Sequence, residues 1–364
     1  MKIAIVHDWL NQKVGGAESV LFELSKMYPD ADIYTLVYDK KFNQYLGTKA
    51  VYKSRLQKFP RFIKKRPKLL LPFIKSAIQK WDFSHYDLVI SSSSAWVKNI
   101  NVPKGARHIC YCHTPARMLW DSWPGYIKDM PLGPVLRFYL VNLASKLRLW
   151  DYYQTQEKIE LIANSRYIAK RISKFYHKTA KVIYPPVETE FLAKQTTNKQ
   201  DYYLILSVLS KYKNIELAIK AFKINGKRLV IAGDGPEMEN LKTLSKGHKN
   251  IEFKGRVDEA TKRELLLFAK GFVFCSIEDF GITMVESIAA GTPVIALRGG
   301  GANEIINEGD TGLFFDSPNI KSLNMAIEKF EKDFNSTKKI DNKYVFSKFD
   351  KNVFVKKIRE AVGE

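Results

Sequence analysis

The sequence predicts an α/β fold made of two Rossmann-like domains, each with a parallel β-sheet covered by helices on both faces. Short apolar runs alternate with helix-like segments along both halves of the chain, a rhythm typical of parallel sheets. The chain has 364 residues, 45% of them hydrophobic, enough for two cores of ordinary domain size. A polar stretch without periodicity, from Pro185-Pro186 to about Gln200, interrupts this alternation.

In the first half the rhythm begins with an apolar strand at 3–6 and a helix at 18–27. A much longer helix is expected near 136–160, and parallel strands on either side of such helices form βαβ units. The other expected strands lie at 33–37, 88–92, 108–112, 161–163 and 182–184.

The second half repeats this pattern, and its clearest helix is 282–290, with Gly291 just past the end and Pro293 opening the next strand. The expected strands are 203–207, 229–232, 251–253, 272–275, 294–296 and 312–315, and an amphipathic helix is expected near 352–362. We therefore expect an N-terminal domain at 1–186, a linker at 187–200, a C-terminal domain at 201–345 and a terminal helical segment at 346–364.

Two glutamates eight positions apart, Glu278 and Glu286, are the most informative feature of the chain. Glu278 follows a buried strand, and Glu286 lies about two turns into the next helix. The helix N-terminus between them has free backbone N–H groups suited to a diphosphate. One carboxylate on each side of the phosphates can meet sugar or ribose hydroxyls, so the stretch predicts a nucleotide-sugar site.

This stretch resembles the E-x7-E signature of retaining family-4 glycosyltransferases, which have the GT-B fold, two Rossmann-like domains facing across a cleft. The resemblance extends over nearly the whole chain, because further motifs of that family follow in the expected order. They are Gly15-Gly16-Ala17-Glu18, Tyr111–Arg117 with a histidine loop, Ala163-Asn164-Ser165, Gly233-Asp234-Gly235-Pro236-Glu237 and Gly255-Arg256-Val257. The segments His7–Leu10 and Tyr111–Asp121 resemble bacterial O-antigen and lipopolysaccharide mannosyltransferases most.

The resemblance implies roles for individual residues. His113, Glu278 and Lys213 would be catalytic, with His113 and Glu278 contacting the transferred sugar and Lys213 neutralising the leaving diphosphate. The terminal helix would cross back onto the N-terminal domain. Donor binding would involve Gly15, Gly16, Lys213, Gly281, Ile282, Thr283 and Glu286, the last through the ribose hydroxyls.

One departure from the family pattern concerns the phosphate site. The family places an arginine where this chain has Val208, and valine cannot act as a bidentate phosphate ligand. Lys211 is a nearby cation that would compensate; otherwise the affinity for the donor is lower.

Several of these motifs also have a purely structural interpretation. Gly15-Gly16 would form a strand-to-helix turn in which glycine permits positive φ, and Glu18 would favour the positive end of the following helix. The loop 233–237 would be either a tight αβ connection or a contact with the base or ribose, and 299–301 would be a similar, flexible loop at the cleft, with Glu304 capping the next helix.

The net charge of +21 is concentrated in the N-terminal half. Residues 1–200 contain 33 Lys+Arg and 15 Asp+Glu, whereas residues 201–364 contain 26 and 23. Residues 49–80 carry eleven basic residues and no acidic one, interleaved with bulky apolar residues, which favours an anionic membrane surface over a solvated face or nucleic acid. We expect Lys64, Lys65, Arg66 and Lys68 to contact the membrane or the acceptor.

Composition argues against a membrane-spanning, secreted, disulfide-bonded or metal-binding protein. The chain has no apolar run long enough for a spanning helix and no signal-peptide pattern at its start, so we expect a cytoplasmic protein, peripheral at the inner face of the plasma membrane. The cysteines are Cys110, Cys112 and Cys275, an odd number that indicates reduced thiols. A metal site at Cys110, Cys112 and His113 is a weak alternative because no second ligand cluster follows. No acidic metal-binding loop is evident, so we expect no metal or other cofactor.

These observations predict a retaining hexosyltransferase that uses a nucleotide-diphosphate sugar, first GDP-mannose and second a UDP-hexose. The acceptor would be a lipid-linked glycan in surface polysaccharide synthesis, and no nucleic acid partner is expected. The alternatives are a GT-B epimerase acting on UDP-N-acetylhexosamine and a pseudoenzyme that binds an anionic partner through its basic face.

Overall fold

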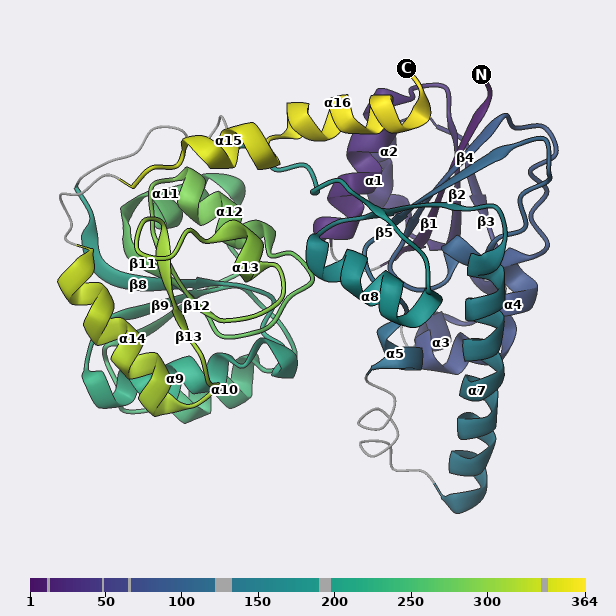
Figure 1. The fold of residues 1–364 in the computed structure, drawn as a ribbon. Coiled ribbons are helices and arrows are strands. Elements are labelled where there is room, and N and C mark those ends of the chain that lie inside the picture. Colours follow the sequence, from purple (N-terminus) through teal and green to yellow (C-terminus); the bar gives the residue numbers. More distant parts are fainter. Residues whose placement is uncertain (12–13, 48, 65–66, 122–132, 190–197, 335–339) are drawn as a thin grey trace. The chain divides into compact units, whose positions relative to one another are not determined.

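The computed structural model describes residues 1–364 except 12–13, 48, 65–66, 122–132, 190–197 and 335–339. The chain divides into two compact units (Figure 1). Unit 1 comprises Met1–Pro185 together with Val355–Glu364, and unit 2 comprises Pro186–Phe354.

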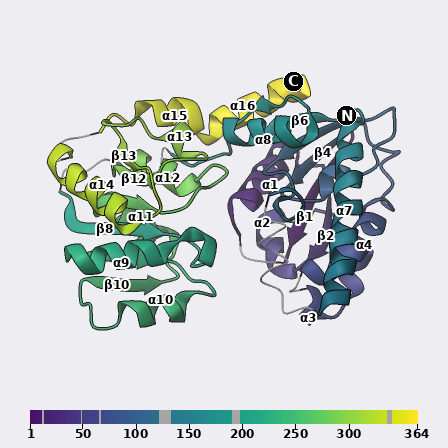
Figure 2. The same ribbon diagram turned by 60° about the horizontal axis from the view of Figure 1, so that its bottom comes forward.

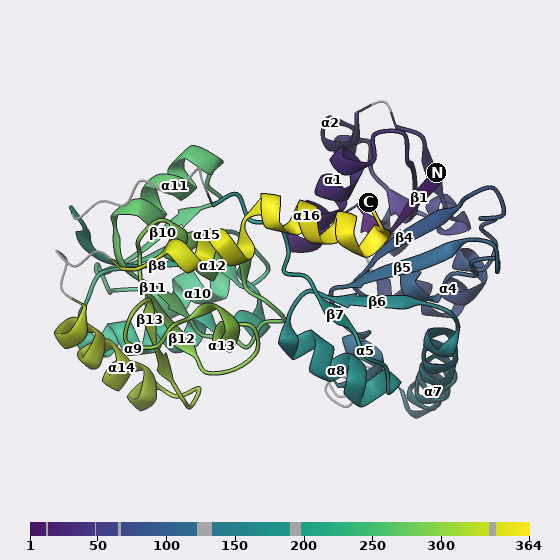
Figure 3. The ribbon, with the colours of Figure 1, turned by 45° about the horizontal axis from the view of Figure 1, so that its top comes forward.

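Unit 1 is built on a seven-stranded sheet with the order β3-β2-β1-β4-β5-β6-β7, in which all neighbouring strands in the described residues pair in parallel. Figure 3 shows β1, β4, β5 and β6 side by side. The strands are β1 Ile3–Leu10, β2 Asp32–Tyr38, β3 Val51–Lys53, β4 Leu88–Ser93, β5 Arg107–Cys112, β6 Glu160–Ala163 and β7 Lys181–Val182.

Helices of unit 1 cover this sheet, and local capping fixes where some of them begin. The hydroxyl of Ser165 accepts a hydrogen bond from the amide of Ile168 and so caps α8. Arg107 donates to the carbonyls of Ala361 and Val362, which attaches the end of the last helix to unit 1. The helices are α1 Gly16–Met27, α2 Asn43–Leu46, α3 Arg61–Lys64, α4 Leu71–Ile78, α5 Arg117–Trp120, α7 Pro134–Gln156, α8 Arg166–Tyr176 and, from Val355 onward, α16 Lys351–Val362.

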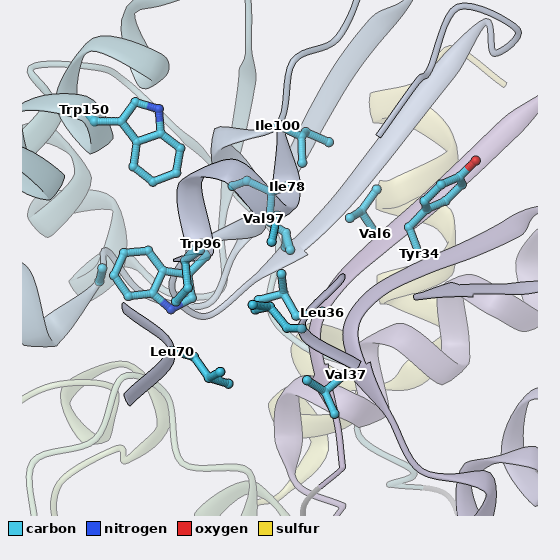
Figure 4. Close-up of a cluster of buried hydrophobic side chains, with 14 of the residues drawn as sticks. Val6, Tyr34, Leu36, Val37, Leu70, Ile78, Trp96, Val97, Ile100 and Trp150 are labelled. Carbon is cyan, nitrogen blue, oxygen red and sulfur yellow. The ribbon is translucent and has the colours of Figure 1, made fainter. Parts of the chain in front are cut away.

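A large core cluster of unit 1 lies between the sheet and the helices α4 and α7 (Figure 4). Leu36 from β2, Ile78 from α4 and Trp96 from the loop after β4 are buried in it. Trp150 brings α7 into the same cluster. Burial of these large apolar side chains contributes most of the favourable free energy that holds the layers together.

Unit 2 contains a six-stranded sheet with the order β10-β9-β8-β11-β12-β13, again parallel throughout the described residues. Figure 2 shows α9, α10 and β10 of this unit. The strands are β8 Gln200–Leu206, β9 Leu229–Ala232, β10 Ile251–Gly255, β11 Ala269–Phe274, β12 Val294–Leu297 and β13 Gly312–Phe315. The helices are α9 Ile215–Asn225, α10 Met238–Ser245, α11 Glu259–Phe268, α12 Ile282–Ala289, α13 Ala302–Ile305, α14 Ile320–Asp333 and α15 Lys343–Phe349.

The expected α/β class and its two parallel sheets are confirmed, and each expected strand has a counterpart. The sequence prediction missed β3, a three-residue edge strand inside the basic segment. It also extended the long helix past Gln156 and the strand at 182–184 past Val182. The expected terminal segment 346–364 is divided: α15 and the start of α16 belong to unit 2, and the rest of α16 belongs to unit 1.

A buried charge network ties the helices of unit 1 to one another. The carboxylate of Asp151, fully buried on α7, accepts from the Lys98 ammonium at 2.7 Å and from the Asn99 amide at 2.7 Å. Its second oxygen accepts from the Trp120 indole N–H and the Tyr176 hydroxyl, each at 2.8 Å. Four donors thus satisfy one buried carboxylate, the condition under which such a charge is tolerated.

Replacing Asp151 should therefore destabilise unit 1 severely. Asp151→Leu leaves the Lys98 ammonium buried without a counter-charge, and we expect a loss of about 3–5 kcal/mol in the free energy of unfolding. The six tryptophans all lie between Trp9 and Trp150, so chemical denaturation followed by tryptophan fluorescence reports on unit 1. The control is Glu160→Gln, which breaks an exposed pair with Arg107 and should cost at most about 1 kcal/mol. Equal losses in the two variants would contradict the assignment.

Candidate functional site

The strand order of both sheets reverses beside the first strand of each unit. In unit 1 the chain proceeds outward from β1 in one direction to β3, and then from β4 in the other. In unit 2 the same reversal lies between β8 and β11. Open α/β sheets bind ligands outside the carboxyl ends of the strands at such switch points. We therefore expect ligand-binding residues in the loops that follow β1, β4, β8 and β11.

In unit 2, Lys213 and Glu278 meet at this position. Lys213 follows β8 and Glu278 follows β11, and the Lys213 ammonium donates to Oε1 of Glu278 at 2.6 Å. The Ser276 hydroxyl donates to the same oxygen at 3.2 Å. Lys213 and Ser276 also line a small hollow between the ends of these two strands. The structure thus brings two of the predicted catalytic residues into direct contact.

Gly281, Ile282 and Thr283 form the N-terminus of α12, as predicted. Gly281 is the N-cap residue with a φ of +105°, and a Cβ there would lie 2.2 Å from the Met284 methyl group. The positive φ therefore favours glycine, whereas the Met284 methyl is the end of a flexible side chain that can move aside. The Met284 amide donates to the Gly281 carbonyl, so the Ile282 and Thr283 amides are the first-turn donors left for an anion at the positive end of the helix dipole.

Glu286 lies one turn into α12, not the expected two, and has a partner that the sequence did not indicate. The Lys262 ammonium, from α11, donates to Oε1 of Glu286 at 2.9 Å and lies 2.7 Å from the Glu259 carboxylate. Burial raises the pKa of the Glu286 carboxyl, and the Lys262 ammonium opposes that shift. Burial alone would lower the pKa of Lys262, but the two carboxylates raise it overall. No periodicity links residues 24 positions apart on different helices, so sequence reasoning missed Lys262.

The glycine loop 299–301 holds the Glu278 segment in place. The Gly301 amide donates to the Glu278 carbonyl at 2.9 Å. A Cβ at Gly300 would lie 2.1 Å from that carbonyl oxygen, and a Cβ at Gly301 would lie 2.1 Å from the Phe280 oxygen. Only a residue without a side chain permits this approach of two backbones. The loop that was expected to be flexible is thus packed closely against the backbone of the Glu278 segment.

The glycines at 233–235 act similarly on the loop that contains Val208. A Cβ at Gly233 would lie 1.8 Å from the Ser207 oxygen, and one at Gly235 would lie 2.2 Å from the Leu209 oxygen. Val208 itself is half exposed, and Lys211 is exposed on the short turn that leads to Lys213. The two loops at the ends of β8 and β9 are thus packed backbone to backbone.

In unit 1, His113 directly follows β5 and is buried. Its Nε2 lies 2.8 Å from the Ser92 hydroxyl, and its backbone carbonyl accepts from the Asn164 side chain at 3.1 Å. Burial lowers the pKa of His113 to about 3, so its imidazole is neutral at physiological pH. The Ala163-Asn164-Ser165 motif is explained in part: Asn164 anchors the histidine loop, and Ser165 caps α8.

The Gly15-Gly16 turn does not need the positive φ that glycine permits. Gly15 is the N-cap of α1 with a φ of −138°, and Gly16 already belongs to the helix. The Gly15 amide donates to Oε2 of Glu18 at 2.8 Å, so Glu18 does cap the helix as the structural interpretation expects. Phosphate approach at this turn remains a prediction.

Asp8 is a structural residue of the site region to which the sequence analysis gave no role. Its buried carboxylate accepts from four consecutive backbone amides, those of 94–97, at 2.6–3.0 Å. This interaction folds the loop after β4 over the end of β1. The family resemblance of the segment His7–Leu10 was the sequence signal that pointed to Asp8. Residue spacing alone does not predict that its carboxylate accepts hydrogen bonds from this loop.

The basic segment 49–80 is less amphipathic than its sequence indicates, because much of its apolar content belongs to the core. Leu56, Leu70, Leu71 and Ile74 are buried, and Phe59, Ile63 and Trp81 pack against the same cluster. Among the described residues of the segment, the exposed bulky ones are Tyr52, Phe62, Leu69 and Phe73. Of the four predicted contact residues, Lys64 donates to the Gln57 carbonyl at 3.1 Å. Lys65 and Arg66 lie outside the described residues, as does the side chain of Lys68.

The three cysteines are free and buried. Within the described part of the chain, no group of three His, Cys, Asp or Glu side chains is arranged to bind a metal ion, which includes the alternative at Cys110, Cys112 and His113. No described helix combines the length and apolar character needed to cross a bilayer.

Two families match this chain, one for each half. Residues 14–191 match the family Glycosyltransferase Family 4, and residues 187–344 match Glycosyl transferases group 1. The two matches overlap at 187–191, just after the boundary between the units.

Individual proteins also match the chain. Alpha-1,3/1,6-mannosyltransferase ALG2 of Dictyostelium discoideum is 24% identical, with 98% of each chain covered. D-rhamnosyltransferase WbpZ of Pseudomonas aeruginosa is 33% identical over 31% of each chain. Among solved structures, Anabaena HepE in complex with UDP has a TM-score of 0.73 at 18% identity, covering 100% of this chain and 99% of that one, which shows a shared fold.

The glycine loop provides a direct test of the unit 2 site. Gly301 has an ordinary φ of −66°, so Gly301→Ala acts only through the clash with Phe280 and should displace the Glu278 segment. Such overpacking costs about 1–3 kcal/mol. Circular dichroism should show a lower midpoint of thermal unfolding, with tryptophan fluorescence of unit 1 unchanged. Gly105→Ala, where a Cβ meets nothing within 4 Å, is the control. A Gly301→Ala variant as stable as the control would rule out the close approach.

Proposed function

The chain is a glycosyltransferase with the GT-B fold, and from that premise we propose that it transfers a hexose from a nucleotide-diphosphate sugar to a glycan acceptor with retention of anomeric configuration. Unit 2 would bind the donor, and unit 1 would bind the acceptor. We propose mannose from GDP-mannose as the first candidate and a UDP-hexose as the second.

The observation that carries this proposal is the arrangement around α12. Its N-terminus offers the Ile282 and Thr283 amides to a diphosphate, with Glu278 before it and Glu286 one turn into it. The Lys213 ammonium lies against Glu278 at 2.6 Å, within reach of a phosphate placed at the same helix end. A cation and helix amides together stabilise a diphosphate leaving group by fixed dipoles and charge. We therefore propose that no metal ion is needed.

In this mechanism Lys213 changes partner. Without donor its ammonium neutralises Glu278; with donor it would turn to the diphosphate, and the freed Glu278 carboxylate would accept from sugar hydroxyls. Glu286 would accept from the ribose while Lys262 keeps it ionised, because burial alone favours the neutral acid. Val208 supplies no second cation, so Lys213 carries this role with Lys211 as the nearest reserve.

The donor assignment rests on similarity. ALG2 of Dictyostelium discoideum is a mannosyltransferase by name, which supports mannose, whereas HepE was solved with UDP, which supports a UDP-sugar. The GT-B epimerase and the pseudoenzyme are the competing proposals, and Val208 is the feature that favours the second.

For the acceptor we propose a lipid-linked glycan at an anionic membrane surface, in surface polysaccharide synthesis. The basic excess of the N-terminal half supports this, as do the exposed Phe62, Leu69 and Phe73 among the basic residues. A second set of exposed apolar residues, Val135, Phe138 and Tyr139, lies at the start of α7.

A panel of GDP- and UDP-sugars tested by thermal shift, followed by NMR of the product, tests the function. Stabilisation by one donor and a product with the donor's anomeric configuration are expected, in EDTA as well as in magnesium. Inversion would exclude the retaining mechanism, and activity only with added divalent ions would exclude the metal-free one. Neither hydrolysis nor transfer with any donor would favour the pseudoenzyme.

Replacing Glu286 and replacing Glu278 should have different effects on nucleotide affinity and turnover. Glu286→Ala should weaken nucleotide diphosphate binding by about 1–3 kcal/mol, since a charged hydrogen-bond partner is lost. Glu278→Ala should lower turnover more than nucleotide affinity. Isothermal calorimetry with GDP and UDP, and initial rates with the sugar donor, separate the two effects. Glu259→Ala is the matched control, because it removes the other, exposed partner of Lys262 and should leave affinity unchanged. Unchanged affinity in Glu286→Ala would refute its role.

The membrane proposal predicts flotation with anionic but not neutral liposomes. Each basic residue near an anionic surface contributes about 1 kcal/mol, and salt screens this attraction. Replacing Lys64, Lys65, Arg66 and Lys68 with Ser should reduce liposome binding and transfer to a lipid-linked acceptor, while donor hydrolysis persists.

The control for this prediction removes the same charge from unit 2, where the exposed Lys246, Lys249, Lys321 and Lys329 are replaced with Ser. Liposome binding should survive in that variant. Equal losses in both variants would mean that net charge, and not the segment, attracts the protein. Equal binding to neutral and anionic liposomes would end the electrostatic explanation.

A further inference from the structure

Four polar side chains form a continuous line through unit 1, from α1 to the end of β5. Oε1 of Glu18 lies 3.9 Å from Nε2 of His7, and Nδ1 of His7 lies 3.1 Å from the Ser92 hydroxyl. That hydroxyl lies 2.8 Å from Nε2 of His113. His7 and Ser92 are direct neighbours on β1 and β4, the pair of strands at the switch point.

The direction of the hydrogen bonds along this line follows from its first member. Burial alone would raise the pKa of Glu18, but His7 and the Gly15 amide lower it overall, so the side chain is a carboxylate and can only accept. At 3.9 Å the Glu18 carboxylate is beyond hydrogen-bond distance from Nε2 of His7, but its charge favours the His7 tautomer whose N–H faces it, so Nε2 carries the proton. In a neutral imidazole the other nitrogen is then bare, so Nδ1 of His7 accepts from the Ser92 hydroxyl.

The hydrogen bond that Ser92 makes to His7 determines which atom is the donor between Ser92 and His113. A hydroxyl has one hydrogen, and when it is donated to His7, the oxygen can only accept from His113. Nε2 of His113 must then carry the proton, and Nδ1 must be bare. Nδ1 has no hydrogen-bond partner among the described residues.

We propose that Glu18, His7 and Ser92 are positioning residues that hold His113 in the Nε2–H tautomer, so that its Nδ1 offers a lone pair to a hydroxyl of the transferred sugar. The first part concerns the protein alone, and the second rests on the proposed function. In this arrangement His113 accepts a hydrogen bond and orients the hydroxyl, but does not donate to it. The Glu18 carboxylate, three side chains away, thus decides what a substrate meets at His113.

Histidine tautomers can be measured directly in the whole protein without ligand. With 15N-labelled histidine, two-bond correlation spectra distinguish protonated from bare ring nitrogens, and the chain has six histidines. The signal of His113 is identified by its loss in His113→Gln. We expect a bare Nδ1 and a protonated Nε2 in the wild-type protein. The opposite pattern would overturn the proposal.

A single isosteric substitution should reverse the direction of the hydrogen bonds from His7 to His113. In Glu18→Gln the amide oxygen can keep the hydrogen bond from the Gly15 amide, and the NH2 group turns toward His7. Nε2 of His7 then accepts, its Nδ1–H donates to Ser92, Ser92 donates to Nε2 of His113, and the proton of His113 moves to Nδ1. Glu23→Gln, on the same helix, makes the same charge change without touching the line and should leave the tautomer as in wild type.

Kinetics separates the two parts of the proposal. Glu18→Gln should lower kcat about tenfold, the effect of one misdirected hydrogen bond, with the KM of the donor and the unfolding midpoint nearly unchanged. A tautomer that does not change in Glu18→Gln overturns the positioning role. A reversed tautomer with unchanged kcat overturns the contact with the sugar hydroxyl, while the donor-binding function of unit 2 stands or falls by its own tests.

Discussion

In both units the strand order reverses beside the first strand, and this constraint locates nearly every candidate residue. Parallel pairing requires each strand to end at the same edge of its sheet, so residues that follow different strands gather there. Lys213 and Glu278 are 65 positions apart and form an ion pair because β8 and β11 are neighbours. His7 and Ser92 meet for the same reason in unit 1.

The charged candidates of unit 2 are already paired before any ligand arrives. Lys213 neutralises Glu278, and Lys262 neutralises Glu286. Partly buried charges of this kind need such partners, because desolvation disfavours an isolated ion. In the proposed function, an incoming diphosphate would compete with Glu278 for Lys213, while the pair with Lys262 would keep Glu286 oriented.

Glycine has two distinct roles in this region. At Gly281 the backbone conformation itself requires glycine, whereas at Gly301 the conformation is ordinary and only the nearby Phe280 backbone excludes a side chain. Both roles support the segment 278–283 that carries the helix N-terminus. A rigid frame of close backbone contacts is what keeps catalytic groups within tenths of an ångström of a productive position.

The sequence by itself determined the two parallel sheets, their strands to within a few residues, and the positions of Glu278, Gly281 and Glu286 along one strand–loop–helix unit. These features are local, because hydrophobic periodicity and glycine placement are written in consecutive residues. Only the tertiary structure decided that Lys262 pairs with Glu286, that Asp8 folds the loop after β4, and that Leu56, Leu70 and Ile74 of the basic segment belong to the core. Those facts depend on which elements become neighbours in the fold. The sequence does not distinguish an apolar residue that faces the core from one that faces the solvent.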